Sequence, residues 1–254
     1  MVTGGGAGIG GACVDALAAA GARVTFVEVD EARARARVEA APGTVEAVLG
    51  DATDPELVAG IAADLGPVDV LVNNVGHHLG STPFLAGEPD RWAALHEVNL
   101  GHALRWSHAL VPGMAERGSG AVVNVSSVEG LRAYPPDPVY GAYKAALLHF
   151  TRSLAMEVAP SGVRVNAVAP DVTQTPQVDY ARWVAPEDEH RWSTWVPMGR
   201  VGTPEETADV VLFLASGLSR FVTGQVIATD GGTLTAGGWF RRPDGRWVNR
   251  PRDP

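Results

Sequence analysis

Short apolar runs alternate with longer Ala- and Leu-rich stretches along most of the chain. The short runs predict buried strands, because they are rich in Val and bounded by turn residues. They lie at 24–27, 45–49, 68–72, 121–125, 162–168 and 223–227. The stretches between them predict helices at 8–20, 30–40, 54–65, 89–117, 139–158 and 204–215. This alternation predicts an α/β fold with a doubly wound parallel sheet, helices on both faces, and ligands at the carboxyl ends of the strands.

The start of the chain departs from this pattern. Only Met1, Val2 and Thr3 precede a glycine-rich run at 4–10. A strand of ordinary length has about five residues. We therefore expect either that the numbered chain lacks its natural start or that the first strand is short.

Composition narrows the class of protein. The chain has 254 residues, of which 46% are hydrophobic, and this suits one soluble α/β domain with a full-sized core. Its net charge of −9 argues against nucleic acid and anionic membranes as partners. The single cysteine, Cys13, excludes an internal disulfide. We find no signal peptide and no apolar run that could span a bilayer, so the cytoplasm is the default compartment.

The first candidate for chemistry is a tyrosine followed by the only lysine of the chain. Tyr140 and Lys144 lie in the predicted helix 139–158, and their i, i+4 spacing places them on one helical face. A free phenol has a pKa near ~10, and a cation within about 4–6 Å lowers it by roughly 1–3 units. Ser127 follows the strand 121–125, where its hydroxyl can hold a substrate oxygen. The three residues indicate proton exchange at an oxygen, as in carbonyl and alcohol redox chemistry.

The second candidate is the glycine-rich run at the start of the predicted helix 8–20. Glycines allow backbone N–H groups to approach a phosphate at a helix N-terminus, where the helix dipole favours an anion. Glu28 ends the next strand and can accept hydrogen bonds from both adenosine ribose hydroxyls. Its charge repels a 2′-phosphate, and no Arg or Lys stands beside it in 28–30. These residues predict NAD(H) as the cofactor rather than NADP(H).

The spacing of Ser127, Tyr140 and Lys144 resembles the active-site signature of the short-chain dehydrogenase/reductase family. The resemblance extends over nearly the whole chain, through the segments Thr3–Gly10, Asn73–Gly76, Val98–Leu100 and Asp230–Gly232. It implies a Rossmann-like fold in a single domain at 1–232 and an oxidoreductase acting on a secondary alcohol or ketone. It further implies a homotetramer that pairs through the helices 89–117 and 139–158.

The resemblance also implies a role for each matching residue. Tyr140 is the general acid/base, Lys144 tunes it and holds the nicotinamide ribose, Ser127 orients the substrate oxygen, and Asn99 distorts its helix and supports a proton relay. The cofactor contacts that it implies are Gly4, Gly6, Gly8, Ile9, Gly10, Glu28, Asp51, Ala52, Asn74, Gly76, Tyr140, Lys144, Val172 and Thr175. The chain has Pro170-Asp171 where the family usually has Pro-Gly, and we expect Asp171 to tolerate the positive φ of that turn.

Substrate contacts are harder to predict, because the pocket falls in loops. The candidates are His78, Glu129, Tyr134, Gln177 and Trp183, and the family comparison makes 177–198 a substrate lid. Aromatic residues in this lid suggest a fairly bulky apolar substrate, although they serve equally well as the lid's own core. We expect the extension 233–254, which carries Trp239, Phe240 and Trp247, to pack on a neighbouring subunit or over the lid.

Three alternatives stay open. One is an NADPH-dependent 3-oxoacyl reductase of the same fold, against which Glu28 argues. Another is a non-catalytic dinucleotide sensor, against which the complete set of catalytic residues argues. The third is a metal site at His77 and His78, although no nearby cysteine or acidic cluster completes it, so we predict no metal.

Overall fold

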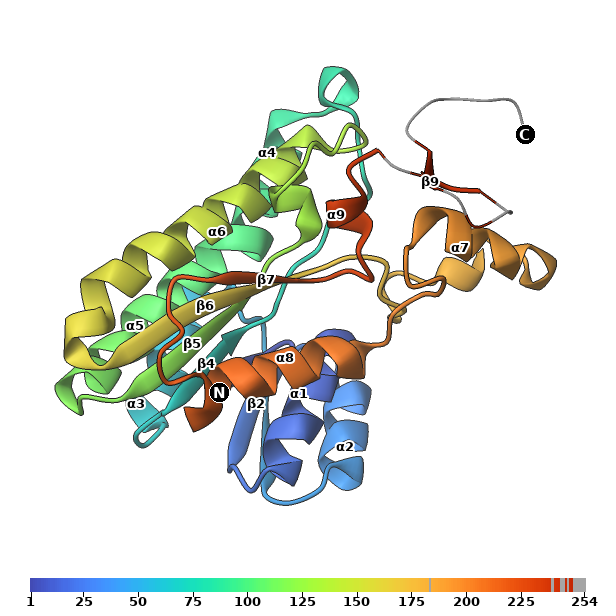
Figure 1. Ribbon diagram of the computed structural model, residues 1–254. Coiled ribbons are helices and arrows are strands. Elements are labelled where there is room, and N and C mark those ends of the chain that lie inside the picture. The colour runs from blue at the N-terminus through green and yellow to red at the C-terminus, as the bar shows by residue number, and fades with distance from the viewer. Residues whose placement is uncertain (183, 239, 243–244, 246, 249–254) are drawn as a thin grey trace.

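The sheet is fully parallel and has seven strands, as the alternation predicted. The computed structural model describes residues 1–182, 184–238, 240–242, 245 and 247–248. Within them the strand order is β3-β2-β1-β4-β5-β6-β7 (Figure 1). The order reverses between β1 and β4, so their carboxyl ends form the crevice where doubly wound sheets bind ligands. The strands are β1 (Val2–Thr3), β2 (Val24–Glu28), β3 (Val45–Leu49), β4 (Val70–Asn73), β5 (Gly120–Val125), β6 (Val163–Pro170) and β7 (Val226–Thr229).

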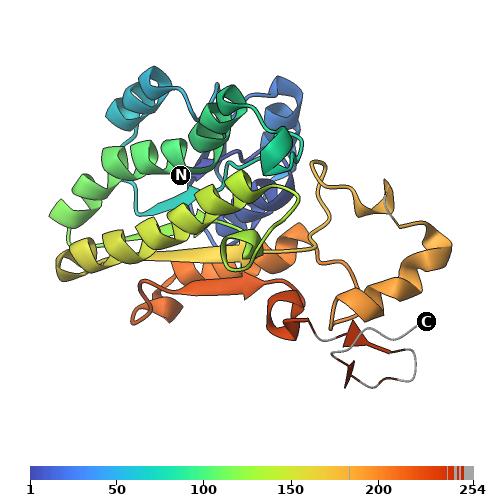
Figure 2. The ribbon, with the colours of Figure 1, turned by 90° about the horizontal axis from the view of Figure 1, so that it is seen from above.

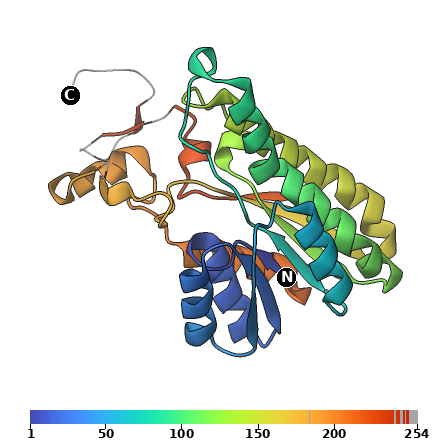
Figure 3. The same ribbon diagram turned by 180° about the vertical axis from the view of Figure 1, so that it is seen from behind.

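Helices cover both faces of the sheet (Figures 1 and 3). One face carries α1 (Gly8–Ala19), α2 (Glu31–Ala40) and α8 (Pro204–Ala215). The other carries α3 (Pro55–Asp64), α5 (His102–Glu116) and α6 (Pro138–Val158). Each set buries its own apolar cluster against the valine-rich strands, and this explains why those strands read as continuous apolar runs.

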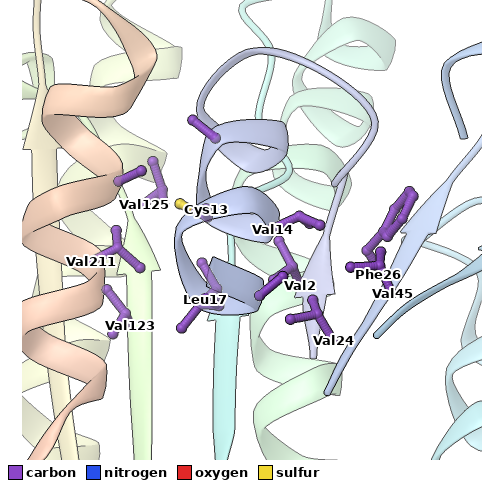
Figure 4. Packing of buried hydrophobic residues seen from close by; sticks show 14 of the residues in the cluster. Val2, Cys13, Val14, Leu17, Val24, Phe26, Val45, Val123, Val125 and Val211 are labelled. Carbon is purple, nitrogen blue, oxygen red and sulfur yellow. The ribbon is translucent and has the colours of Figure 1, made fainter. Parts of the chain in front are cut away.

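The first strand has only two residues, yet it is central to the sheet. Val2 and Thr3 pair in parallel with β2, and Val2 also pairs with β4. Cys13 and Leu17 of α1 pack against this part of the sheet, with Val211 of α8 beside them (Figure 4). Burial raises the pKa of the Cys13 thiol to about 12. Cys13 is therefore a structural residue and not a nucleophile.

The helix that we predicted at 89–117 is interrupted. It consists of α4 (Pro89–His96), a π-helical turn at Glu97–Gly101 and α5. Inside the turn, the side-chain amide of Asn99 donates to the backbone oxygen of Leu95 over 3.0 Å. A polar side chain that enters the hydrogen-bond ladder is a known cause of helix distortion.

The lid and the C-terminal extension lie beyond the carboxyl edge of the sheet (Figure 2). The lid holds 3₁₀ turns at Tyr180–Arg182 and Pro186–Arg191 and the short helix α7 (Trp192–Trp195). The extension begins with α9 (Thr233–Ala236) and continues as an antiparallel pair, β8 (Phe240–Arg241) and β9 (Trp247–Val248), which the sequence did not predict. β8 lies against α7. In the part of the chain that the structure describes, no helix has the length and apolarity to cross a membrane.

Candidate active site

A cleft of about 1100 Å³ lies along the carboxyl ends of the strands. It brings together residues from segments that are far apart in the chain. The predicted site residues on its wall are Gly4, Gly8, Ile9, Gly10, Glu28, Asp51, Ala52, Asn74, Gly76, His78, Ser127, Glu129, Tyr134, Tyr140, Lys144, Val172, Thr175 and Gln177. Gly6 and Asn99 do not line the cleft but support residues that do. Trp183 lies outside the described residues.

The cap of α6 places the phenol of Tyr140. Asp137 is the N-cap, Pro138 takes the first helical position, and the Asp137 carboxylate accepts a hydrogen bond of 3.1 Å from the Tyr140 N–H. Tyr140 thus lies in the first turn, and Lys144 follows one turn later. The Lys144 ammonium is 5.7 Å from the centroid of the Tyr140 ring and donates to the backbone oxygen of Val125 over 3.3 Å.

Burial shifts the pKa values of Tyr140 and Lys144 in opposite directions. It raises the pKa of Tyr140 well above 10, while the Ser127 hydroxyl acts in the opposite direction. It also lowers the pKa of Lys144 to about 8, because the ammonium is completely removed from solvent. We expected Lys144 to lower the phenol pKa. In this structure the phenol pKa is raised, because desolvation of the phenolate is the largest cause and Lys144 is not among the groups that act on it.

Ser127 stands where β5 ends. Its hydroxyl accepts from the Glu129 N–H over 3.2 Å and donates to the Pro170 backbone oxygen over 3.5 Å. The neighbouring Ser126 donates to the Lys144 backbone oxygen over 2.9 Å and so ties the strand to α6. These bonds hold the serine and the lysine in one rigid frame at the end of the sheet.

The glycine-rich run forms an anion-binding turn. Gly4 and Gly8 have φ values of 66° and 56°, which favour glycine. A Cβ on Gly10 would lie 2.1 Å from the Gly4 backbone oxygen, so the chain must approach itself closely here. No side chain caps the first N–H groups of α1, and its first turn has no acidic residue. The free N–H groups and the helix dipole therefore suit a pyrophosphate.

Glu28 closes the adenosine end of the cleft. Its carboxylate accepts backbone hydrogen bonds from Gly6 over 3.0 Å, from Val29 over 3.0 Å and from Asp30 over 3.1 Å. A Cβ at Gly6 would lie 2.5 Å from the carboxylate, so Gly6 acts by leaving room for Glu28. The segment 28–30 holds no cation, but Arg33 of α2 also lines the cleft. The Arg33 guanidinium lies 3.4 Å from the carboxylate of Asp30, the N-cap residue of the same helix.

Residues after β3 and β4 complete this end of the cleft. The Asn74 side chain donates to the backbone oxygens of Thr3 and Gly4 over 3.0 Å and 3.1 Å and so holds the glycine turn. A Cβ on Gly76 would lie 2.6 Å from the Lys144 nitrogen, which explains a glycine at this position. Asp51 follows β3 and accepts from the Thr53 N–H over 2.8 Å. The shape and donors of this region fit a nicotinamide dinucleotide.

Asn99 acts on the loop that carries the histidines. Its amide donates to the His77 backbone oxygen over 2.8 Å and accepts from the His77 N–H over 3.1 Å. The distortion expected from the family comparison is therefore present, and it clamps the loop after β4. The proton relay that the comparison implies for Asn99 stays a prediction.

The segment after β6 corrects our expectation about its turn. Val172, not Asp171, has the positive φ, at 39°. A β-branched residue is strained in this region. The Asp171 carboxylate accepts from the Val172 N–H over 2.9 Å, and the Gly202 N–H donates to the Val172 oxygen over 2.8 Å. Both backbone groups of Val172, which the resemblance places against the cofactor, are thus engaged. Thr175 lies beside Gly8, with its Cβ 3.5 Å from the position of a Cβ there.

His77 and His78 are adjacent rings with centroids 5.0 Å apart. Burial lowers the pKa of both imidazoles. His77 accepts from the Leu79 N–H over 2.7 Å through Nδ1, so this nitrogen is already used. Among the residues that the structure describes, no three His, Cys, Asp or Glu side chains are grouped to hold a metal ion.

Two residues that the sequence prediction omitted from the site complete the substrate end of the cleft. Arg132 and Asp171 line it and form an ion pair of 2.8 Å. Their meeting joins the segment after β5 to the segment after β6, and no local signal in the sequence could have shown it. The lid aromatics behave differently: Tyr180 and Trp192 pack with Val172 and Val196 in a small core of the lid, and Trp195 lines the cleft.

Known proteins with the same arrangement are numerous. A family model described as enoyl-(acyl carrier protein) reductase matches residues 4–234. Galactitol 2-dehydrogenase of Rhizobium johnstonii is 40% identical over 244 residues, which cover 91% of this chain and 93% of the relative. The 3-oxoacyl-[acyl-carrier-protein] reductase FabG of Chlamydia muridarum is 35% identical over 240 residues, covering 91% and 95%.

The fold agrees with these sequence matches. A solved structure described as a short chain dehydrogenase/reductase family protein superimposes with a TM-score of 0.84 at 34% identity, and the match covers 92% of this chain and 96% of that chain. The relatives are dehydrogenases and reductases acting on CH–OH groups, so the alternative of a non-catalytic sensor is set aside. The glycine turn, the half-buried tyrosine, the buried lysine and these matches agree, and the chain belongs to the short-chain dehydrogenase/reductase family of oxidoreductases.

Proposed function

We propose that this enzyme interconverts a secondary alcohol and a ketone with NAD(H) as its cofactor. The observation that carries the proposal is the placement of Ser127, Tyr140 and Lys144 on the wall of the cleft that also holds the glycine turn. A substrate oxygen between the serine and the phenol is within reach of a proton donor and a second hydroxyl. With its pyrophosphate at the glycine turn and its nicotinamide ribose at Lys144, the bound cofactor would supply the hydride acceptor or donor.

The residues of the chain handle the proton. Because burial raises the pKa of Tyr140, the phenol holds its proton at neutral pH and can donate it to a ketone oxygen as that oxygen gains charge. In the direction of alcohol oxidation, the buried Lys144 ammonium stabilises the phenolate that must form. Ser127 orients the reacting oxygen, and Asn99 fixes the loop that covers Lys144. These roles are part of the proposal.

The preference for NAD(H) rests on Glu28. Its carboxylate is buried at the end of β2, where a 2′-phosphate would meet a like charge. Arg33 is the observation that favours NADP(H), and with it the alternative of an NADPH-dependent 3-oxoacyl reductase. Its guanidinium lies 3.4 Å from the Asp30 carboxylate, however, so part of its positive charge is compensated.

The expectation of a bulky apolar substrate stays a prediction. Trp192 is buried in the lid core and only 7% exposed, whereas Tyr180 and Trp195 line the cleft. The polar groups beside Ser127 give a further guide to the substrate.

The test of the reaction is the substitution Tyr140→Phe. We expect turnover to fall by about 10²-fold to 10⁴-fold, because the general acid is lost, while NADH binding is kept. Alcohols are screened with NAD at the nicotinamide absorbance, and NADH affinity is measured by fluorescence. Tyr143→Phe is the matched control, since Tyr143 lies on the same helix and packs against His96. Near-normal turnover in Tyr140→Phe would end the assignment.

We also propose a homotetramer. The helices α5 and α6 cover one face of the sheet, and Met156 on α6 is 78% exposed. Near the edge strand β7, Leu218 is 77% exposed and Phe221 fully exposed. Apolar side chains of this size on the surface suit contacts between subunits. The division at 232, the packing of the extension 233–254 on the lid or a neighbouring subunit, and the cytoplasmic location stay predictions.

A further inference from the structure

Three charged side chains stand on the cleft wall next to Ser127: Glu129, Arg132 and Asp171, here called the acid–arginine cluster. Arg132 Nη2 donates to Glu129 over 3.0 Å and to Asp171 over 2.8 Å. Glu129 lies two residues after Ser127, and Asp171 follows Pro170, whose oxygen accepts from the Ser127 hydroxyl. The cluster is thus built around the residue that orients the reacting oxygen.

The cluster is held firmly from outside the cleft. The Thr233 hydroxyl donates to Asp171 over 2.6 Å, and the other Asp171 oxygen accepts from the Val172 N–H. The exposed fractions of the side chains are 13% for Glu129, 11% for Asp171 and 31% for Arg132. Groups that are this constrained keep their positions when a substrate enters, so they can select it.

The acid–arginine cluster keeps hydrogen-bond donors and acceptors that its own ion pairs do not use. A guanidinium carries five N–H donors and each carboxylate has about four acceptor positions. Among the described residues, Nη1 of Arg132 has no hydrogen-bond partner, and Glu129 accepts only from Arg132. The cleft therefore presents both donors and charged acceptors a few ångströms from Ser127.

The charges of the cluster exclude anionic substrates. One guanidinium faces two carboxylates, so its positive charge is more than balanced. Burial raises the pKa of Glu129, as expected where negative charge is crowded and poorly solvated. His77 and His78 add no positive charge at neutral pH, because their pKa values are lowered. A carboxylate or phosphate on the substrate would meet no uncompensated cation here.

The cluster also disfavours an alkyl chain. A hydrocarbon laid over Glu129, Arg132 and Asp171 would remove their water without replacing its hydrogen bonds, and this is costly for charged groups. A neutral molecule with several hydroxyls avoids both penalties. Its O–H groups donate to the carboxylates, and its oxygens accept from the guanidinium.

We infer that the substrate is a neutral polyhydroxylated alcohol or its keto form, with hydroxyls on the carbons next to the reacting one, and that the acid–arginine cluster selects it. The inference rests on the proposed function for the redox step and adds none of its own. It assigns Glu129, Arg132 and Asp171 to substrate specificity and not to proton transfer.

The experiment compares substrates that differ only in the feature at issue. Wild-type enzyme is assayed with NAD and four probes: a hexitol, a simple secondary alcohol of similar length, an aldonate, and a 3-hydroxyacyl thioester. We expect kcat/KM for the hexitol to exceed that for the other three by at least about 100-fold. Preference for the simple alcohol, the aldonate or the thioester would overturn the inference.

The cluster variants test the assignment of residues. Arg132→Gln and Glu129→Gln should lower kcat/KM for the polyol by about 10-fold to 100-fold, mainly through KM, because each removes charged hydrogen bonds. The loss should be smaller for the simple alcohol, which makes no hydrogen bonds to the cluster, and their NADH affinity should match the wild type. Arg220→Gln, on the surface outside the cleft, is the control. Equal losses on both substrates would mean a structural role and contradict the inference.

Binding separates this inference from the proposed reaction. Each polyol is titrated into the enzyme–NADH complex, and NADH fluorescence reports binding without turnover. Polyol binding that Arg132→Gln weakens, in an enzyme that oxidises no alcohol, would support the cluster and count against the proposed function. Turnover of alcohols without polyol binding would support the proposed function and contradict the role of the acid–arginine cluster.

Discussion

The two ends of the cleft differ in the groups that form their walls: backbone at the cofactor end and side chains at the substrate end. At the cofactor end, formed by the segments after β1 to β4, the wall is largely backbone: glycine turns, free N–H groups and a carboxylate held by three N–H donors. At the substrate end, side chains from distant segments meet, such as Arg132 with Asp171, 39 residues apart, and Thr233 with Asp171, 62 apart. Backbone suits a ligand that is the same in every turnover, whereas side chains can be exchanged to fit a particular substrate.

The largest effect should come from breaking the backbone of the cofactor end. Gly10→Ala places a Cβ 2.1 Å from the Gly4 oxygen and 2.4 Å from the Asn74 amide. The turn must then move, and we expect NADH affinity to fall by about 100-fold or more, measured by fluorescence titration. Gly60→Ala is the control: it lies in α3 with open space around its Cβ position, so it should bind NADH normally and gain about 0.5–1 kcal/mol in stability. Normal NADH binding by Gly10→Ala would show that the turn does not hold the cofactor.

The next effect concerns Glu28, the side chain that we propose selects NADH over NADPH at the cofactor end. Glu28→Ser removes the charge that faces a 2′-phosphate and leaves Arg33 nearby. We expect the ratio of NADPH to NADH affinity to rise by about 10-fold to 100-fold. Titrations with both cofactors measure this ratio. Glu46→Ser, an exposed change on β3, should leave it unchanged, and a wild-type enzyme that prefers NADPH would overturn the NAD assignment.

The smallest effect concerns the pH dependence of stability and involves His102 on α5, which lies behind both ends of the cleft. This imidazole is fully buried. Burial, with help from the charge of Lys144, lowers the pKa of His102 to about 3. The unfolded chain binds a proton near pH 6.5 and the folded protein does not, so this group makes stability fall as the pH drops from 7 to 5, by roughly 2 kcal/mol.

Denaturant unfolding at the two pH values measures that change. His102→Gln should reduce the difference in unfolding free energy between pH 7 and pH 5 by the amount given above. His108→Gln, an exposed change on the same helix, is the control. If both variants keep the wild-type pH dependence, His102 does not titrate as its burial requires.

Much of the fold was predictable because its signals are local. Valine-rich runs marked the strands to within a few residues at β2, β3 and β5, and the capping box at Thr203 and Glu206 marked the start of α8. The i, i+4 spacing of Tyr140 and Lys144 was enough to predict that both lie on one helical face. Helix geometry and side-chain alternation operate within a few residues, so the sequence carries them openly.

The hairpin β8–β9 and the π-helical turn were not predicted in detail. Two strands of two residues each have too little pattern to detect, and they depend on packing against α7. Asn99 did signal a distortion, but its clamp on His77 links residues 22 positions apart. Each of these features depends on a neighbour that becomes adjacent only when the chain is folded.

The sequence by itself determined the sheet, the glycine turn and the order of the catalytic residues, because each follows from short-range geometry. Only the tertiary structure decided that the phenol of Tyr140 has a raised pKa, that Val172 takes the positive φ, and that Arg132 lies between Glu129 and Asp171. Desolvation and ion pairing depend on everything that surrounds a group in space. That environment comes from segments distant in the chain, and no local pattern encodes it.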